Sequence, residues 1–269
     1  MKKLIQLPIS DNPNFSSGAI IHDDFVSING LQRCGTTSTR TYIMNAFNEG
    51  LITGNLNQYV ARFHMPVRLC SKQDLNNKKI IGNIRHPLSF YASYIDYHKN
   101  SRSGYLDDYS TYKCYNSLDD LKFKQILHIL LFKLDWVNFA NNLDGHHYKN
   151  SQYWETNQQL QVGLYTKRYI NMFFNNGDEI LNNWTTQQFF DNHDKELTVT
   201  NIVKLENFKN DMDNALSIEK SGEMPYENKS SYNPSNKSLQ DVISERYDDE
   251  SIAWVKEREK IFFDKYYKE

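Results

Sequence analysis

The amino-acid sequence predicts a three-layer α/β domain in which helices flank a mostly parallel central sheet. Runs of β-branched and apolar residues at 24–29, 79–84 and 197–206 have the composition of buried strands. Stretches with helical periodicity separate these runs. Strands joined through helices pair in parallel, because the connection has to cross the sheet before the next strand begins. With 269 residues and no proline- or serine-rich linker, the chain favours one domain over 1–269.

The first strand, loop and helix are expected to follow one another directly. Strand 24–29 leads to Gly30, and a loop then runs to Gly35. Helical periodicity extends over 36–49. Gly50 is placed to end this helix, because glycine tolerates the left-handed conformation of a helix C-terminus.

The second strand, 79–84, precedes another predicted helix. Pro87 suits the first turn of a helix, and the periodicity continues to about Lys99. Polar turn residues and tyrosines at 100–116 are typical of a long surface loop or lid. Helical periodicity returns at 118–142.

The last part of the chain is predicted to contain one strand and several helices. A helix is expected at about 156–174, followed by the third strand and by a short helix over 207–219. After an irregular segment, two charged helices close the chain at 239–247 and 250–267.

Charge and composition exclude several classes of function. The formal net charge is -2, so the chain lacks the global basic field that binds nucleic acid. The longest apolar stretch, 126–137, is interrupted by His128, Lys133 and Asp135 and is too short to span a bilayer. The N-terminal residues do not form a signal peptide pattern. A cytoplasmic protein without a membrane span is therefore expected.

The cysteines predict neither a disulfide framework nor a zinc site. Cys34, Cys70 and Cys114 are odd in number, far apart and without a Cys-x-x-Cys pair. Reduced thiols and no metal are expected.

The loop from Gly30 to Gly35 has the glycine spacing of the phosphate-binding sequence G-x-x-x-x-G-K-[ST], so a P-loop-like domain is expected. Its glycines let successive N–H groups converge, and the following helix start adds a partial positive charge, which favours an anion. Thr36 stands at the lysine position, which disfavours ATP hydrolysis and kinase chemistry. Arg33 supplies the cation instead. The alternative interpretation is a tight turn with a capped helix.

A second cationic position follows the strand 79–84. Arg85 stands at the strand end, and Ser93 lies eight residues further on in the predicted helix. An arginine can grip a phosphate through its planar fork, and a serine two turns into the helix can add a hydroxyl. The alternative interpretation of Arg85 is a surface salt bridge.

The loop QRCGTT followed by IRHPLSFYASY resembles the 5′-phosphosulfate loop and the 3′-phosphate motif of the sulfotransferase family. The resemblance implies 3′-phosphoadenosine 5′-phosphosulfate (PAPS) as the donor and adenosine 3′,5′-bisphosphate (PAP) as the product, with no metal. The implied donor contacts are Arg33, Cys34, Gly35, Thr36, Thr37, Ser38, Arg85, Ser93, Lys229 and Ser230. Ser38 and Leu205 stand where cytosolic members have tryptophan and tyrosine, which favours the bacterial and carbohydrate-modifying branches.

The resemblance also implies catalytic roles. RFHMP at 62–66 is similar to the Lys-Thr-His-Leu-Pro segment of cytosolic members and puts His64 at the catalytic base. Arg33 would stabilise the charge that develops on the leaving phosphate. Glu49 is the alternative base, because Golgi-type members use a glutamate.

The family resemblance suggests how the chain is divided. A donor-binding core is expected at about 24–99 and 197–235, an acceptor or lid region at about 100–196, and C-terminal helices at 239–267. The acceptor would be a hydroxyl of a carbohydrate or small metabolite. A non-catalytic nucleotide- or phosphate-binding module and a kinase-like phosphoryl transferase are the competing hypotheses. The sequence makes no prediction about oligomeric state.

Overall fold

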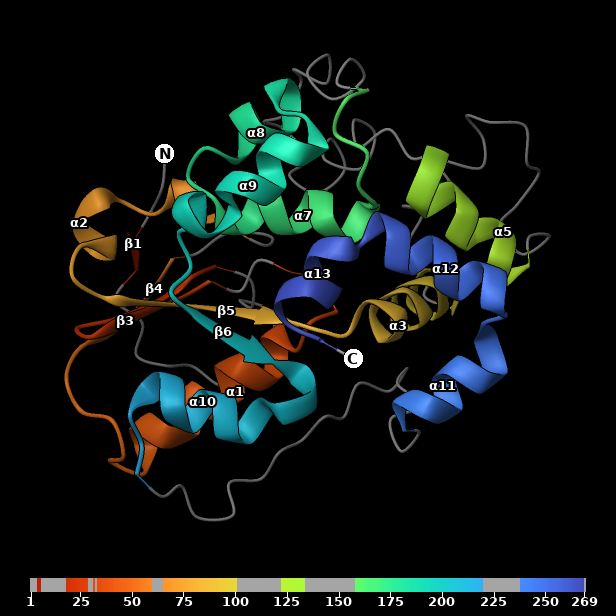
Figure 1. Cartoon of the computed structure of the whole chain (residues 1–269). Helices are drawn as coiled ribbons and strands as arrows, with labels where there is room; N and C mark the ends of the chain where they lie inside the picture. The colour runs from red at the N-terminus through yellow and green to blue at the C-terminus, as the bar shows by residue number, and fades with distance from the viewer. Residues whose placement is uncertain are drawn as a thin grey trace. The chain divides into compact units, whose positions relative to one another are not determined.

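The computed structural model of the chain (Figure 1) divides into two compact units. It describes residues 4–5, 18–28, 31, 33–59, 65–100, 122–133, 158–219 and 238–268. The first unit comprises 1–85, 169–177 and 192–228, and the second comprises 86–168, 178–191 and 229–269. Each unit is described by itself below.

The chain is an α/β protein. Its strands are β1 (Leu4–Ile5), β2 (Ile20–His22), β3 (Phe25–Ile28), β4 (Leu56–Tyr59), β5 (Lys79–Ile84) and β6 (Asn201–Lys204). The α-helices are α1 (Thr36–Asn48), α2 (Lys72–Leu75), α3 (Pro87–Asn100), α5 (Phe123–His128), α7 (Leu164–Phe173), α8 (Gly177–Asn183), α9 (Thr186–Glu196), α10 (Phe208–Leu216), α11 (Leu239–Arg246), α12 (Asp249–Arg258) and α13 (Lys260–Lys265). Shorter elements are the 3-10 turns η1 (Val67–Leu69) and η5 (Leu205–Asn207) and the π-helix η3 (Ile129–Lys133).

The sheet of the first unit is mixed, so the expectation of a mostly parallel sheet is wrong. Its strand order is β1-β4-β2-β3-β5-β6. Only β3, β5 and β6 run parallel, while the pairs β2–β3, β2–β4 and β1–β4 are antiparallel. The cause is a hairpin that the sequence analysis missed, because β2 is only three residues long and turns into β3 through Asp23 and Asp24. The parallel half was predicted correctly.

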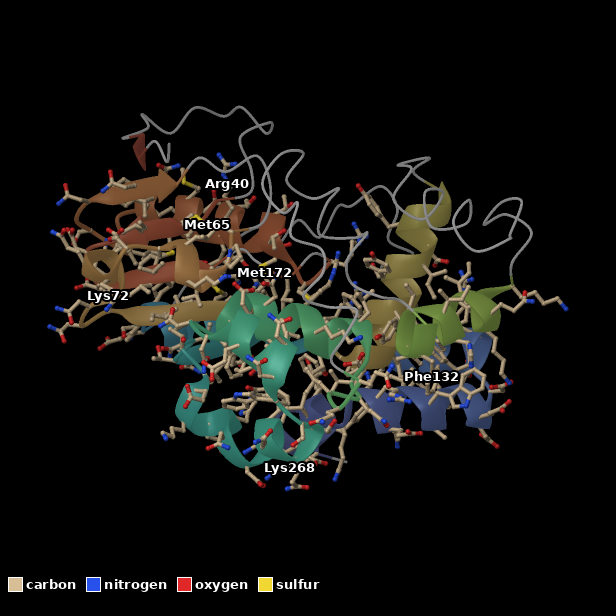
Figure 2. The ribbon with its side chains drawn as sticks, turned by 90° about the horizontal axis from the view of Figure 1, so that it is seen from above. Arg40, Met65, Lys72, Phe132, Met172 and Lys268 are labelled. Carbon is tan, nitrogen blue, oxygen red and sulfur yellow. The ribbon has the colours of Figure 1, made fainter. Side chains whose placement is uncertain are left out.

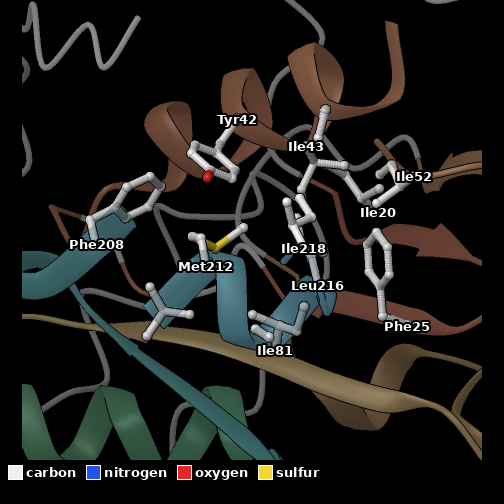
Figure 3. Close-up of a cluster of buried hydrophobic side chains, with 13 residues drawn as sticks. Ile20, Phe25, Tyr42, Ile43, Ile52, Ile81, Phe208, Met212, Leu216 and Ile218 are labelled. Atoms are coloured by element: carbon white, nitrogen blue, oxygen red, sulfur yellow. The ribbon is translucent and has the colours of Figure 1, made fainter. Parts of the chain in front are cut away.

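Helices α1 and α10 cover one face of this sheet (Figure 1), and both were predicted. Buried side chains from these helices meet those of the strands, as Figure 3 shows for Tyr42, Phe208, Met212, Phe25 and Ile81. Because side chains alternate along a strand, the odd-numbered positions of β3 and β5 face these helices. The short first-unit part of α7 contacts the opposite face, beside β5.

Two of the predicted elements begin or end elsewhere. The helix expected from about residue 156 starts at Leu164, because the preceding amides have tertiary partners. Gly163 N donates to Arg258 O at 2.9 Å, and Gln161 N donates to Thr186 Oγ1 at 2.8 Å.

The third strand is shorter than the predicted 197–206. Only Asn201–Lys204, the residues of β6, pair as a strand. Just before them, Ile80 N donates to the hydroxyl of Thr200 at 2.8 Å, and this bond replaces a backbone hydrogen bond of the sheet. The helices α8 and α9 were not predicted. Their sequence is rich in asparagine and glutamine, and asparagine is a weak helix former.

The predicted helix 250–267 is broken at Glu259, whose side chain is fully buried in the second unit. Its carboxylate accepts hydrogen bonds from Thr166 N at 2.8 Å, Thr166 Oγ1 at 2.6 Å, Tyr165 N at 3.2 Å and the Tyr91 hydroxyl. Glu259 therefore satisfies amides that the first turn of α7 leaves without helical partners. A side chain at Gly163 would prevent this, since an added Cβ would lie 2.0 Å from Glu259 Oε1.

Aromatic rings pack around this carboxylate. Tyr165 stacks between Phe90 and Phe262, with ring centroids 4.0 and 4.2 Å away, and all three rings are buried. Burial raises the pKa of Glu259 to about 7, although the hydrogen bonds from Thr166 and Tyr91 favour the charged form.

Within the described ranges, every helix is too short or too polar to cross a membrane.

The stability of the chain should fall as the pH rises from about 4.5 to 7. Below that range Glu259 is protonated in both the folded and the unfolded chain. Within the range the unfolded chain loses the proton first, because its Glu259 carboxyl has the ordinary pKa of 4.5. The loss should reach on the order of 3 kcal/mol above pH 7. Denaturant unfolding across this range should show that Glu259→Gln removes the fall, since glutamine does not ionise.

The matched control is Glu257→Gln, which changes an exposed carboxylate of α12. It should keep the wild-type slope. An unchanged slope in Glu259→Gln would show that the buried carboxyl is not the group responsible.

Candidate anion-binding site

Two predicted motifs of the first unit lie at the same edge of the sheet. The parallel strands β3 and β5 are neighbours, so their carboxyl ends lie side by side. The loop 29–35 leaves the end of β3, and Arg85 directly follows the end of β5. Ligands of open α/β sheets bind outside the carboxyl ends of the strands. This edge is therefore the candidate site.

The described part of the loop curls through two left-handed residues. Arg33 has a φ of 65° and Gly35 a φ of 82°, and the right-handed helix α1 begins at Thr36. Left-handed and right-handed residues in succession turn neighbouring N–H groups towards one side, which forms an anion-binding concavity. A non-glycine residue such as Arg33 holds this conformation only where its surroundings enforce it.

The N-terminus of α1 has no side-chain cap from its N-cap residue. Gly35 occupies the N-cap and has no side chain that could accept the first amides of the helix. The first turn, Thr36–Thr39, contains no acidic residue that would compensate the positive end of the helix. Thr37 is exposed, while Thr36 and Ser38 are half-buried. The site thus combines amide donors, hydroxyls and a partial positive charge.

Hydrogen bonds fix the start of α1 to strand β5. Asn83 Nδ2 donates to Thr39 Oγ1, and Thr39 Oγ1 donates to Gly35 O at 3.1 Å. Thr39 N also donates to Gly35 O, at 2.9 Å. Asn83 and Thr39 are both buried, so these bonds form away from water. They hold the left-handed glycine in place.

Arg85 lies against the loop. Its Nη1 donates to the carbonyl oxygen of Arg33 at 3.4 Å, and both residues are half-buried. The Arg85 side chain therefore contacts the backbone of the loop at Arg33. A guanidinium offers five N–H donors in a planar fork, which suits a phosphate group.

Arg40 adds a further cation to α1 (Figure 2). It lies one turn after Thr36, and helical side chains lean towards the N-terminus of their helix. Partial burial lowers the pKa of Arg40 from its ordinary value. Arginine nevertheless stays charged in proteins.

Other predicted site residues have different positions. Cys34 is fully buried and its N–H donates to Leu31 O at 3.3 Å, so neither its thiol nor its amide faces solvent. Ser93 is buried in α3 and belongs to the second unit. Outside the described residues lie Gly30, His64, Lys229, Ser230, Cys114 and the predicted lid 101–116.

Glu49, the alternative base, lies far from the loop along α1. It caps the C-terminus of α1, at the opposite end from the loop. Thirteen residues at 1.5 Å each separate the two ends by about 20 Å. A carboxylate at that distance does not reach an acceptor bound at the loop.

The sequence analysis missed the residues that support the loop. Asn83 is the one polar residue in the segment IIGNI of β5, and this contrast was the available signal. Leu205 gave no such signal. It follows β6, and its Cδ1 would lie 2.6 Å from a Cβ added to Gly35.

Comparison with known protein families, curated protein sequences and solved structures finds no match for this chain. Among the described residues there is no group of three or more His, Cys, Asp or Glu side chains that could hold a metal ion.

Gly35→Ala should disrupt the loop more than backbone strain alone explains. The control is Gly50→Ala, because Gly50 has a similar φ of 72° but nothing within 4 Å of an added Cβ. Gly50→Ala should cost about 1 kcal/mol in unfolding free energy and bind inorganic pyrophosphate as wild type does. Gly35→Ala should cost more, because Leu205 and the backbone have to move, and it should weaken pyrophosphate binding. Equal effects of the two substitutions would contradict the packing described for the loop.

Proposed function

We propose that the protein is a sulfotransferase that moves the sulfuryl group of PAPS to an acceptor hydroxyl, on a carbohydrate or small metabolite. The observation that carries the proposal is the contact between Arg85 Nη1 and the carbonyl of Arg33, at 3.4 Å. It brings together the two motifs whose resemblance to the sulfotransferase family was noted in the sequence.

The chemistry of the donor fits the residues of this site. PAPS carries a charge of roughly -4 distributed over two ends, so it needs two separate groups of cations and N–H donors. The loop amides, with Arg33, suit the phosphosulfate, which supplies the sulfuryl group. Arg85 suits the 3′-phosphate. The uncapped first turn of α1 supports this assignment, because its amides have no side-chain acceptor at Gly35.

Transfer requires stabilisation of the leaving phosphate and removal of a proton from the acceptor. Arg33 and the N–H groups of the loop stabilise negative charge near the bridging oxygen. His64 is proposed as the base on the resemblance of RFHMP, since an imidazole with a pKa near about 6.5 suits base work at neutral pH. The arginine and the helix N-terminus replace the magnesium ion that triphosphate enzymes use.

Phosphoryl transfer from ATP is the less favoured alternative. The lysine that reaches the β- and γ-phosphates in P-loop enzymes is replaced by Thr36, which carries no charge.

Arg85→Ala should weaken binding of adenosine 3′,5′-bisphosphate by about ten- to a hundredfold, since a charge-assisted contact contributes about 1.5 to 3 kcal/mol. Titration calorimetry would measure this. Adenosine 5′-phosphate, which lacks the 3′-phosphate, should bind the wild type and Arg85→Ala equally. Arg85→Lys should recover part of the affinity, because lysine keeps the charge but loses the planar fork. Equal affinity of the wild type for the two nucleotides would contradict the role of Arg85.

Transfer of labelled sulfate from PAPS to a panel of sugars, phenols and small alcohols tests the reaction itself. His64→Ala should keep donor binding and lose about 10²- to 10⁴-fold in turnover. A wild type that binds the bisphosphate but transfers no sulfate to any acceptor would favour the non-catalytic module. Stabilisation by ATP with magnesium, and not by the bisphosphate, would favour the kinase-like alternative.

A further inference from the structure

A cavity of about 630 Å³ lies along the C-terminal helices of the second unit. We call it the C-terminal groove. It is lined by Lys256, Lys260, Phe263, Asp264, Tyr267 and Lys268. Its volume is within the range of small-molecule sites in proteins.

The groove has aromatic walls that are held in place. Phe263 of α13 and Tyr267, which follows this helix, are half-buried and lie on the same side of the C-terminal segment. Each ring packs edge-on against His86, with centroids 5.5 and 5.0 Å away. His86 is itself 4 % exposed. Contact with the buried His86 therefore holds both rings in position.

Cations surround these rings. Lys256, Lys260 and Lys268 are exposed, and Lys256 Nζ lies 5.9 Å from the centre of the Phe263 ring. Figure 2 labels Lys268. Asp264 offsets one of them, with its Oδ2 3.7 Å from Lys260 Nζ. Three lysines against one aspartate give the groove a local positive charge in a chain whose net charge is -2.

Helix ends commonly carry lysines near their C-termini, because these compensate the helix dipole. That explanation accounts for Lys256 in the last turn of α12. The helix dipole does not explain why Phe263 and Tyr267 line the same groove as the lysines. Rings and ammonium groups together match a ligand that has both a planar ring and an anionic group.

We propose that the C-terminal groove binds a small molecule in which a planar ring carries one sulfate or phosphate group. The ring stacks on Phe263 or Tyr267, and the ammonium groups of Lys256 and Lys260 bind the anion. This site goes beyond the proposed function and does not depend on it, because none of the residues that line the groove is used in that proposal.

The test uses 1-naphthyl sulfate, 1-naphthyl phosphate, 1-naphthol and inorganic phosphate, with binding followed by naphthalene fluorescence or, for inorganic phosphate, by calorimetry. At least one of the two esters should bind at least about tenfold more tightly than 1-naphthol and inorganic phosphate, because only an ester offers both ring and charge. The two ester arms distinguish a sulfate site from a phosphate site. Lys256→Gln combined with Lys260→Gln should weaken ester binding by about tenfold or more.

The matched control is Lys265→Gln, which changes an exposed lysine of α13 that does not line the groove. It should leave ester binding unchanged. Loss of binding in Arg85→Ala, with none in the Lys256 and Lys260 variant, would place the ester in the loop and overturn the inference. Absence of saturable binding by either ester would overturn it as well, whatever the sulfotransferase assay shows.

Discussion

The candidate site depends on a short chain of hydrogen bonds from Asn83 through Thr39 to the carbonyl of Gly35. A left-handed N-cap glycine is by itself an adaptable position, because glycine occupies many backbone conformations at little cost. The buried side-chain amide of Asn83 removes this freedom and sets the first turn of α1 beside β5, the strand that Arg85 follows. Each neutral bond contributes only about 1 kcal/mol, but their geometry decides where the amides point.

The residues that support the loop differ from those that are proposed to bind the donor. Asn83 and Thr39, which hold the loop, are buried, whereas Arg33 and Arg85, which are proposed to hold the donor, are half-buried. Leu205 packs closely against Gly35, so the end of β6 also fixes the loop. In the second unit Glu259 has a comparable role, since its buried carboxylate completes the first turn of α7.

The sequence predicted those parts of the fold that have strong local signals. The strands at 25–28 and 79–84 have apolar β-branched runs, and the helix after Pro87 has a clear start, so their bounds agree closely with the structure. Strand β2 was missed because three residues are too few to show a period. The break at Glu259 was missed because its cause is a contact with residues about 95 positions earlier, which helical periodicity does not record.

Only those features of the candidate site that have a local sequence pattern were predicted. Glycine spacing and the position of Arg85 are local patterns, and the structure puts both at one edge of the sheet. The support by Asn83 and Leu205 is tertiary and has no counterpart in a motif. The role of His64 stays a prediction, because that residue lies outside the described part of the chain.

The most direct test of the central claim is a crystal structure of the protein with adenosine 3′,5′-bisphosphate. The account predicts the 5′-phosphate on the N–H groups at the start of α1 and the 3′-phosphate on the guanidinium of Arg85. A nucleotide bound elsewhere, or one whose 3′-phosphate does not contact Arg85, would contradict it.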